Sequence, residues 1–298
     1  MTASFTFLVN QASGGGAAPD AVVPIARRLR DAGAAVDVTY SPGPQATTEL
    51  VGAAVSRGDV VVAVGGDGML SSLVGEVARL GGTLGLVPAG RGNDFARMLG
   101  IPVDPAQQAE TLLAGRVSAV DLISYDGRRT VAGSVYAGVD AAADLVVDRA
   151  HWLPKALQYP YAAVRSLATY RPGRYTVSVD GVAQDFCAAT VVVANSAYYG
   201  KGMRIAPSAV VDDGLLEVVV VGAASRRGLI RSLPKVYDGR HVELDQVTVL
   251  QGRRVEIAAE AGTPVLVGGD GEHLGVLPAR GQAPAVVAVL PGALRVLR

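Results

Sequence analysis

The chain has 298 residues, of which 50% are hydrophobic and 18% are charged, so it holds enough apolar side chain for a large core. This composition excludes a disordered or low-complexity protein. Its 27 basic and 27 acidic residues cancel, whereas nucleic-acid-binding proteins usually carry a basic excess, and we therefore expect no nucleic-acid partner. The one cysteine, Cys187, excludes an intramolecular disulfide and fits a reducing compartment.

No segment of the sequence has the features of a targeting signal or a membrane span. Residues 1–10 lack the basic start and the long apolar stretch of a signal peptide. The aliphatic runs at 191–194, 218–221 and 285–290 are far shorter than the about 20 residues that a helix needs to cross a bilayer. The sequence therefore predicts a cytoplasmic protein that at most contacts the inner face of a membrane as a peripheral partner.

The first part of the chain alternates between short strand-like runs and helical stretches. Residues 60–64 are all apolar, which is typical of a strand buried on both faces of a parallel sheet. Predicted strands also lie at 5–9, 36–40 and 83–87, and predicted helices at 21–32, 46–56, 70–80 and 93–99. This alternation predicts a doubly wound α/β domain over residues 1–121.

From about residue 122 the pattern changes to strands with little helix between them. Strand-like segments recur at 130–136, 175–179, 186–194, 215–221 and 255–259, and Asp-Gly turns lie at 180–181 and 213–214. Residues 151–170 are predicted as a helix that Pro154 and Pro160 interrupt early. These features predict an antiparallel β-sandwich over residues 122–284.

Two glycine-rich loops follow predicted strands of the α/β domain. In the first, Gly65-Gly66-Asp67-Gly68, backbone N–H groups and the start of a helix favour an anion. Asp67 would repel a bare phosphate, which indicates a metal ion or a hydroxyl as its partner; the alternative is a glycine turn whose Asp caps the helix. In the second, residues 88–95, Gly90 and Gly92 permit close approach, and Asn93 or Asp94 can cap the next helix.

A third glycine-rich motif, Gly268-Gly269-Asp270-Gly271-Glu272, lies in the β-rich half. Its two carboxylates could supply a general base and a charge near a metal ion, although the motif alone is more typical of an exposed hairpin turn. Together, the three motifs predict a nucleotide site with a base supplied across the cleft between the domains.

In order and spacing, these motifs resemble the diacylglycerol kinase catalytic family, which includes bacterial soluble lipid kinases and sphingosine kinases. The matching segments are G-G-D-G at 65–68, P-A-G-x-G-N-D-F-A-R at 88–97, A-N at 194–195, D-G-L-L at 213–216 and D-G-E at 270–272. The resemblance implies a nucleotide domain, a β-sandwich lipid-substrate domain and an active site between them. It also implies that the final segment, 285–298, returns to the first domain.

The resemblance further implies cofactors and site residues. ATP and Mg²⁺ are expected, with Glu272 as the proton acceptor, Asp270 beside it, and Asp67 holding the metal or ordering its water. A structural magnesium site would map to the backbone carbonyls of Val210 and Leu215 and the carboxylate of Asp213, which is otherwise a turn residue before Gly214. Expected nucleotide contacts come from Asn10, Thr39, Gly65, Gly66, Asp67, Gly68, Ser71, Gly90, Arg91, Gly92, Asn93 and Asp94.

The chain departs from the family pattern where ATP is expected. Met69 stands at the position of a threonine, and Ser71 and Ser72 stand where an Asn and a Glu are usual. Arg91 replaces the threonine of the second loop. Each lost hydrogen bond is worth about 0.5–1.5 kcal/mol net, and Arg91 could compensate by binding phosphate.

The resemblance favours an ATP-dependent kinase that phosphorylates the hydroxyl of a diacylglycerol-like lipid. The alternatives are a non-catalytic nucleotide- or lipid-binding member of the same fold and a kinase of a soluble dinucleotide such as NAD. The sequence leaves open whether the lipid is a diacylglycerol or a sphingoid base, and whether the protein is a monomer or a homodimer.

One segment of the chain suits contact with a membrane surface, where a lipid substrate would be met. Residues 149–174 contain no Asp or Glu, but have five basic residues interleaved with Trp152 and three tyrosines. A second basic stretch lies at 226–235. The alternative is a docked helix with solvated arginines.

Overall fold

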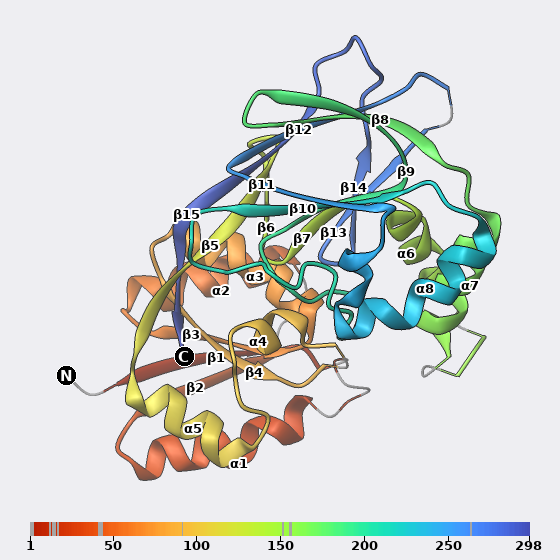
Figure 1. The fold of residues 1–298 in the computed structure, drawn as a ribbon. Helices are drawn as coiled ribbons and strands as arrows, with labels where there is room; N and C mark the ends of the chain where they lie inside the picture. Colours follow the sequence, from red (N-terminus) through yellow and green to blue (C-terminus); the bar gives the residue numbers. More distant parts are fainter. Residues whose placement is uncertain are drawn as a thin grey trace. The chain divides into compact units, whose positions relative to one another are not determined.

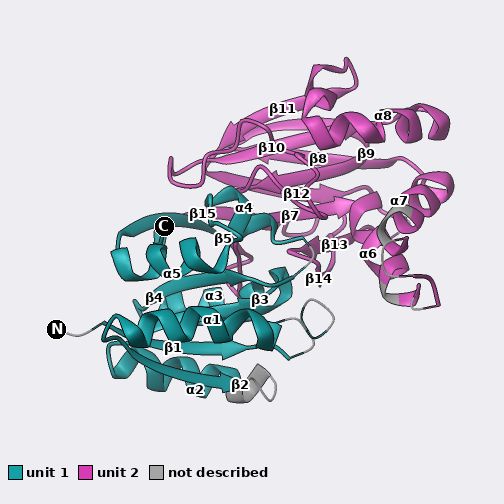
Figure 2. Cartoon of the chain, turned by 90° about the horizontal axis from the view of Figure 1, so that it is seen from below, with its two compact units in different colours: residues 1–122, 291–298 teal, residues 123–290 magenta. Residues whose placement is uncertain are grey.

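The computed structural model describes residues 3–11, 13, 16, 18–40, 44–90, 92–150, 152–154, 157–262 and 264–298. The chain divides into two compact units, which Figure 2 shows in different colours. Unit 1 comprises Met1–Leu122 and Pro291–Arg298, and unit 2 comprises Ile123–Leu290. We expected the return to the first domain to begin at residue 285; it begins at Pro291, because residues 285–288 pair with a strand of unit 2.

Unit 1 is a parallel sheet with helices on both faces, as the α/β pattern predicted (Figure 1). Its strands are β1 (Ser4–Val9), β2 (Ala35–Tyr40), β3 (Val60–Gly65) and β4 (Thr83–Pro88). They pair in the order β2-β1-β3-β4, and the end of β15 (Ala285–Leu297) pairs with β4. All of these pairs are parallel.

The helices of unit 1 explain why β3 is uniformly apolar. They are α1 (Ala18–Asp31), α2 (Pro44–Ser56), α3 (Asp67–Arg79), α4 (Asp94–Met98) and α5 (Pro105–Ala114). On one face, α1 and α5 lie side by side, and Ile25 and Leu29 share a core with Phe7 and Val62. On the other face, α2 and α3 lie side by side (Figure 1). A strand covered on both sides has no solvent-facing positions for polar residues.

Unit 2 is the predicted β-sandwich, and its strand pairs are antiparallel. Its strands are β6 (Arg129–Val131), β7 (Ser134–Gly138), β8 (Gly173–Val179), β9 (Val182–Ala194), β10 (Leu216–Gly222), β11 (Val247–Gly252), β12 (Arg254–Ala259), β13 (Leu266–Gly269) and β14 (Glu272–Val276), with the end of β5 (Val117–Tyr125) and the start of β15. One core joins Val177, Val191, Val218, Ile257 and Val287, each from a different strand.

Unit 2 has more helix than the sequence predicted. Its helices are α6 (Val139–Arg149), α7 (Gln158–Thr169), α8 (Arg226–Asp238) and the 3₁₀ helix η2 (Arg240–Glu243). Of these, only α7 was expected, and it is shorter than the predicted 151–170. Among the described residues, no helix combines the length and the hydrophobicity needed to cross a bilayer.

Candidate nucleotide and catalytic sites

The predicted nucleotide contacts of unit 1 gather at one edge of its sheet. Parallel strands β1 to β4 all end there, with Val9 opposite Val64, Leu8 opposite Thr39, and Gly65 opposite Pro88. Asn10, Gly66 and Ala89, which follow the ends of β1, β3 and β4, therefore share this edge. In open α/β sheets, ligands bind outside the carboxyl ends of the strands.

The two glycine loops touch each other through their backbones. The N–H of Ala89 donates to the carbonyl of Gly65 at 2.8 Å. A Cβ added to Gly90 would overlap the Cα of Gly66, and one added to Gly66 would lie 3.0 Å from the Cα of Gly90. Both positions therefore require glycine for the contact between the loops, a reason that the sequence analysis did not anticipate.

Asp67 links the first loop to the second. Its Oδ1 accepts a hydrogen bond from the N–H of Asp94 at 2.8 Å, at the start of α4. Asn93 occupies the N-cap position of α4, as expected, but its side chain does not cap the helix: it bonds both the N–H and the carbonyl of Gly90, at 3.0 and 3.1 Å. Asp94 has its own ion pair with Arg97, at 2.9 Å. Asp67 thus caps α4 and not α3, whose N-cap Gly66 has no side chain.

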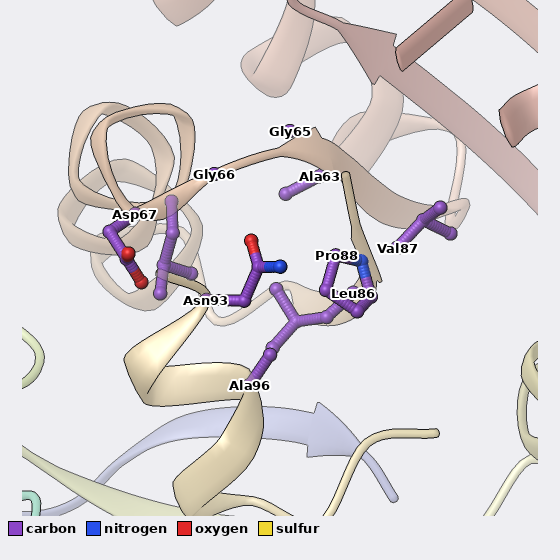
Figure 3. Close-up of a pocket in the computed structure, with 10 residues that line it drawn as sticks. Ala63, Gly65, Gly66, Asp67, Leu86, Val87, Pro88, Asn93 and Ala96 are labelled. Carbon is purple, nitrogen blue, oxygen red and sulfur yellow. The ribbon is translucent and has the colours of Figure 1, made fainter. Parts of the chain in front are cut away.

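A small pocket opens between the two loops (Figure 3). Asp67 and Asn93 supply its polar side chains, and the full lining is Ala63, Gly65, Gly66, Asp67, Leu70, Leu86, Val87, Pro88, Asn93 and Ala96. Burial raises the pKa of Asp67, and the backbone N–H groups of Asp94 and Asn93 lower it; the balance lies above its usual value. A carboxylate in this position is stabilised in its ionised form by a nearby cation.

The first loop leads into the start of α3, where the sequence predicts an anion site. This helix has 13 residues and begins at Asp67. Gly68 is exposed, and among the described residues nothing accepts its N–H. Free N–H groups and the dipole at a helix start favour a phosphate. Ser71 lies half-buried on the same helix, whereas Arg91 is outside the described residues.

Asp270 holds the turn that carries Glu272. It adopts a positive φ of 47°. Its carboxylate accepts hydrogen bonds from the N–H groups of Ala132, Gly133 and Ser134 at 2.8–3.1 Å. These contacts give Asp270 a structural role that the sequence analysis did not predict, and its catalytic role stays a prediction.

A buried tyrosine supports the same turn from inside unit 2. The N–H of Gly271 donates to the hydroxyl of Tyr136 at 3.0 Å, and this hydroxyl donates to Asp144 on α6 at 2.6 Å. Burial and the charge of Asp144 raise the pKa of Tyr136 well above its usual value, so the phenol stays neutral. No local motif marks the role of Tyr136, because the turn that it supports lies 135 residues further along the chain.

Glu272 differs from Asp270 and Asp144, whose carboxylates both accept hydrogen bonds. It is exposed at the start of β14, where it pairs through its backbone with Gly269. Its carboxylate makes no hydrogen bond or ion pair with any residue that the structure describes. Glu272 is therefore able to accept a proton without first breaking a contact.

Comparisons with known proteins cover nearly the whole chain. Residues 4–125 match the model of the diacylglycerol kinase catalytic domain, and residues 133–298 match that of the YegS C-terminal NAD kinase beta sandwich-like domain. A protein of Mycobacterium tuberculosis named diacylglycerol kinase is 33% identical over 98% of this chain and 94% of its own length. The chain belongs to the diacylglycerol kinase catalytic-domain family.

Other relatives of this kinase family support the assignment. A Bacillus subtilis diacylglycerol kinase is 27% identical over 76% of this chain and 75% of its own. A crystal structure of a Bacillus anthracis protein, 22% identical, has a TM-score of 0.79 and covers 99% of this chain and 94% of its own. Another, of a Bacillus anthracis diacylglycerol kinase, is 19% identical with a TM-score of 0.73, over 99% and 96% of the two chains. The predicted class, a lipid kinase, is confirmed at the level of the family, and these structures support the fold.

The departures from the kinase pattern have visible structural consequences. Met69 is buried, and its Cβ lies 2.8 Å from where a Cβ of Gly65 would be. The Ser72 hydroxyl donates to the carbonyl of Met69 at 2.7 Å. Where the family usually offers a threonine and a glutamate, this kinase therefore has an apolar side chain and a hydroxyl already engaged by its own helix.

The loop expected to hold the structural Mg²⁺ of the kinase lies in unit 2. Asp213 Oδ1 accepts a hydrogen bond from the N–H of Leu215 at 2.9 Å, as in a simple turn. No group of three acidic, histidine or cysteine side chains that could bind a metal occurs in the described residues. One carboxylate and the carbonyls of Val210 and Leu215 are an oxygen-only set, which fits a Mg²⁺ ion that keeps several waters. The site stays a prediction.

Proposed function

We propose that the protein transfers the γ-phosphoryl group of ATP to the hydroxyl of a diacylglycerol-like lipid. The proposal rests on its family and on the relatives named diacylglycerol kinase. The observation that carries it is the exposed, unpaired carboxylate of Glu272 on a turn fixed by Asp270 and Tyr136. An unpaired acid held in one place is what a general base needs.

The glycine loops of unit 1 would bind the triphosphate. The N–H groups at the start of α3 offer donors without adding positive side chains, and the pocket between the loops receives part of the nucleotide. Mg²⁺, when bound, would neutralise charge on the phosphates, and Asp67 is the residue of this edge that would hold it or its water.

The chemical step needs one proton acceptor. As the lipid hydroxyl oxygen forms its bond to the γ-phosphorus, the bond from that phosphorus to the β-γ bridging oxygen breaks, and ADP leaves. The hydroxyl proton passes to Glu272. Because positioning and charge neutralisation supply most of the rate in phosphoryl transfer, loss of the base is expected to lower turnover by about 10²–10⁴-fold and not to abolish it.

Substitution of the base tests the mechanism. We expect Glu272→Gln to lower the kcat for lipid phosphorylation by about 10²–10⁴-fold while ATP affinity, measured by calorimetry, stays unchanged. The matched control is Glu243→Gln, which changes an exposed glutamate on η2 and should keep full activity. Normal turnover of Glu272→Gln would place the base elsewhere.

A panel of acceptors tests the substrate class. Radiolabelled ATP is offered with a diacylglycerol, a sphingoid base and NAD, and the labelled products are separated. We expect label in phosphatidic acid. Transfer to NAD alone would make the protein a dinucleotide kinase, and ATP binding without transfer to any acceptor would make it a non-catalytic member of the family.

A further inference from the structure

Two surface segments that are far apart in the sequence lie side by side in unit 2. The Tyr170 hydroxyl, at the end of α7, donates to the carbonyl of Ala224 at 2.6 Å, just before α8. The Arg226 side chain donates to the carbonyl of Tyr170 at 3.3 Å. Leu167 and Leu229 belong to one buried cluster between the helices. The basic and aromatic stretch of α7 and the basic stretch of α8 therefore form neighbouring parts of one surface (Figure 1).

The solvent side of α7 carries a row of apolar and aromatic side chains beside the exposed Arg165. Its inner side buries Ala162, Ser166 and Leu167. On the opposite side, at helical spacing, lie Leu157, Tyr161 and Val164, of which Leu157 is 53% and Val164 44% exposed. Trp152 is 70% exposed, and its ring meets that of Tyr161 edge-on, with centroids 5.8 Å apart. We name Trp152, Leu157, Tyr161 and Val164 the apolar stripe.

The solvent side of α8 is basic. Arg227, Arg231 and Lys235 follow one another at intervals of four residues, so they project from one side of the helix, and all three are exposed. Leu229, Ile230 and Leu233 pack inward on the other side. None of the three cations forms an ion pair with a residue that the structure describes. We name Arg227, Arg231 and Lys235 the basic ridge.

We propose that the apolar stripe and the basic ridge together are the surface with which this protein docks on an anionic lipid bilayer. Residues 149–174 and 222–237 contain no acidic residue, so nothing in these segments offsets the ridge. Aliphatic and tryptophan side chains partition into the interface of a bilayer, and basic side chains are drawn to anionic headgroups. A second copy of the chain is a poorer partner, because a two-fold interface would bring one basic ridge towards another.

The proposal deepens the proposed function, because a kinase of membrane lipids must reach its substrate at a bilayer. It can be tested without turnover, since Trp152 is the only tryptophan of the chain and reports directly on the stripe. Vesicles of phosphatidylcholine, with and without phosphatidylglycerol, are mixed with the full chain. We expect sedimentation and a blue shift of tryptophan emission with the anionic vesicles, both weakened by added salt.

Variants separate the two parts of the surface. Neutralising the ridge (Arg227→Gln, Arg231→Gln and Lys235→Gln together) should weaken binding to anionic vesicles about a hundredfold, since each charge near the surface contributes about fivefold. The matched control neutralises three exposed arginines of unit 1: Arg27, Arg28 and Arg116. Leu157→Ser with Val164→Ser should reduce both sedimentation and the blue shift, whereas Val103→Ser, at a residue 80% exposed in unit 1, should change neither.

Three outcomes would overturn the proposal. They are the absence of vesicle binding, binding without a change in Trp152 emission, and a blue shift without lipid that depends on protein concentration. The last would indicate an interface between copies of the chain. Activity on a short-chain, water-soluble diacylglycerol distinguishes a failure of the docking proposal from a failure of the proposed function. The ridge variant should keep that activity and lose activity only on vesicles.

Discussion

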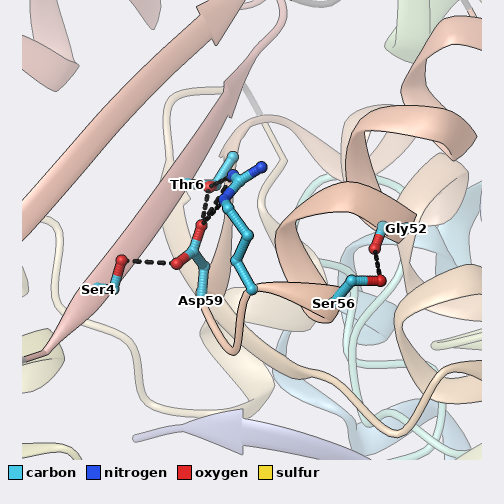
Figure 4. Close-up of polar contacts among 6 residues, drawn as sticks. Ser4, Thr6, Gly52, Ser56 and Asp59 are labelled. Atoms are coloured by element: carbon cyan, nitrogen blue, oxygen red, sulfur yellow. Dashed lines mark hydrogen bonds and ion pairs between the residues drawn. The ribbon is translucent and has the colours of Figure 1, made fainter. Parts of the chain in front are cut away.

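A buried carboxylate of unit 1 serves the fold and not the candidate site. Asp59 directly precedes β3, at the other end of this strand from Gly65, and Figure 4 shows its polar contacts. It accepts hydrogen bonds from Ser4 at 2.6 Å, from Thr6 at 2.7 Å and from Arg57 at 2.8 and 3.0 Å. Burial raises the pKa of Asp59. The hydrogen bonds and the charge of Arg57 lower it by more than burial raises it, so the pKa lies below its usual value.

This lowered pKa makes stability depend on pH. Since the folded pKa lies below the unfolded value of 3.8, ionised Asp59 adds stability above that pH, and the contribution is lost as the pH falls through the folded pKa. We expect Asp59→Ala to lower the free energy of urea unfolding by about 2–4 kcal/mol at neutral pH, because it leaves buried donors without an acceptor. The difference from the wild type should shrink below about pH 4.

The control for Asp59 is an exposed aspartate of the same unit. Asp31 lies on α1, with its side chain 72% exposed and 3.9 Å from Arg27. Asp31→Ala should change the free energy of unfolding by no more than about 0.5 kcal/mol. If the two variants had equal effects, the buried network would not stabilise the fold.

Single residues were predictable where a motif marks them and not where a distant partner decides their role. Glu272 and Asp67 stand in glycine-rich turns that can be recognised in the sequence. That Asp67 caps α4, and that Tyr136 supports the turn of Glu272, depends on contacts between distant parts of the chain. Cys187 lies within a strand and is nevertheless exposed, because only the part of β9 from Ala188 onward is buried.

At the scale of elements, the two glycine loops act as one unit, and glycine substitutions can separate folding from binding. We expect Gly90→Ala to lower the free energy of unfolding by about 1–3 kcal/mol, because the new methyl group would meet the backbone of Gly66 and Asn93 Oδ1, 2.7 Å away. ATP affinity should fall with it. Urea unfolding and calorimetric titration with ATP measure the two effects.

Gly68→Ala is the matched control for the loop contact. A Cβ at Gly68 has open space and an ordinary φ, so stability should change by less than about 1 kcal/mol. If phosphate binds at the start of α3, this variant should still lose ATP affinity, because the methyl group sits where the nucleotide approaches. Equal destabilisation by the two alanines would show that the contact between Gly66 and Gly90 does not matter.

The helices and strands whose hydrophobic residues follow a clear pattern were predicted from the sequence. Helix α8, which contains residues that usually break helices, was not. The apolar run of β3 and the helical spacing of α1 identified the α/β unit. α8 contains Gly228 and Pro234, which usually break helices, yet Ser225 caps its start by accepting from the N–H of Gly228 at 3.1 Å. Pro160 did not shorten α7 further, because a proline is tolerated in the first turn of a helix.

At the scale of the whole molecule, the end of the chain completes the sheet that begins it. β15 pairs with β12 through residues 285–288 and with β4 through Arg295 and Val296. The N–H of Gly292 also donates to the buried Asp121 at 2.7 Å. No local pattern in residues 291–298 indicates a strand beside β4; the return was expected only from the family resemblance.

This long-range pairing predicts that the last strand matters for the stability of unit 1. Leu294, Val296 and Leu297 are all buried, and Leu294 is fully so. We expect Leu294→Ala to lower the free energy of urea unfolding by about 2–5 kcal/mol, because the cavity lies in a packed core and cannot collapse completely.

The matched control for Leu294 is Leu113→Ala, at a leucine of α5 that is 38% exposed and whose truncation leaves no closed cavity. Its effect should be below about 1.5 kcal/mol. ATP titration of the folded variants adds a second measurement. If Leu294→Ala were as stable as Leu113→Ala, the returning strand would lie against unit 1 without contributing to its core.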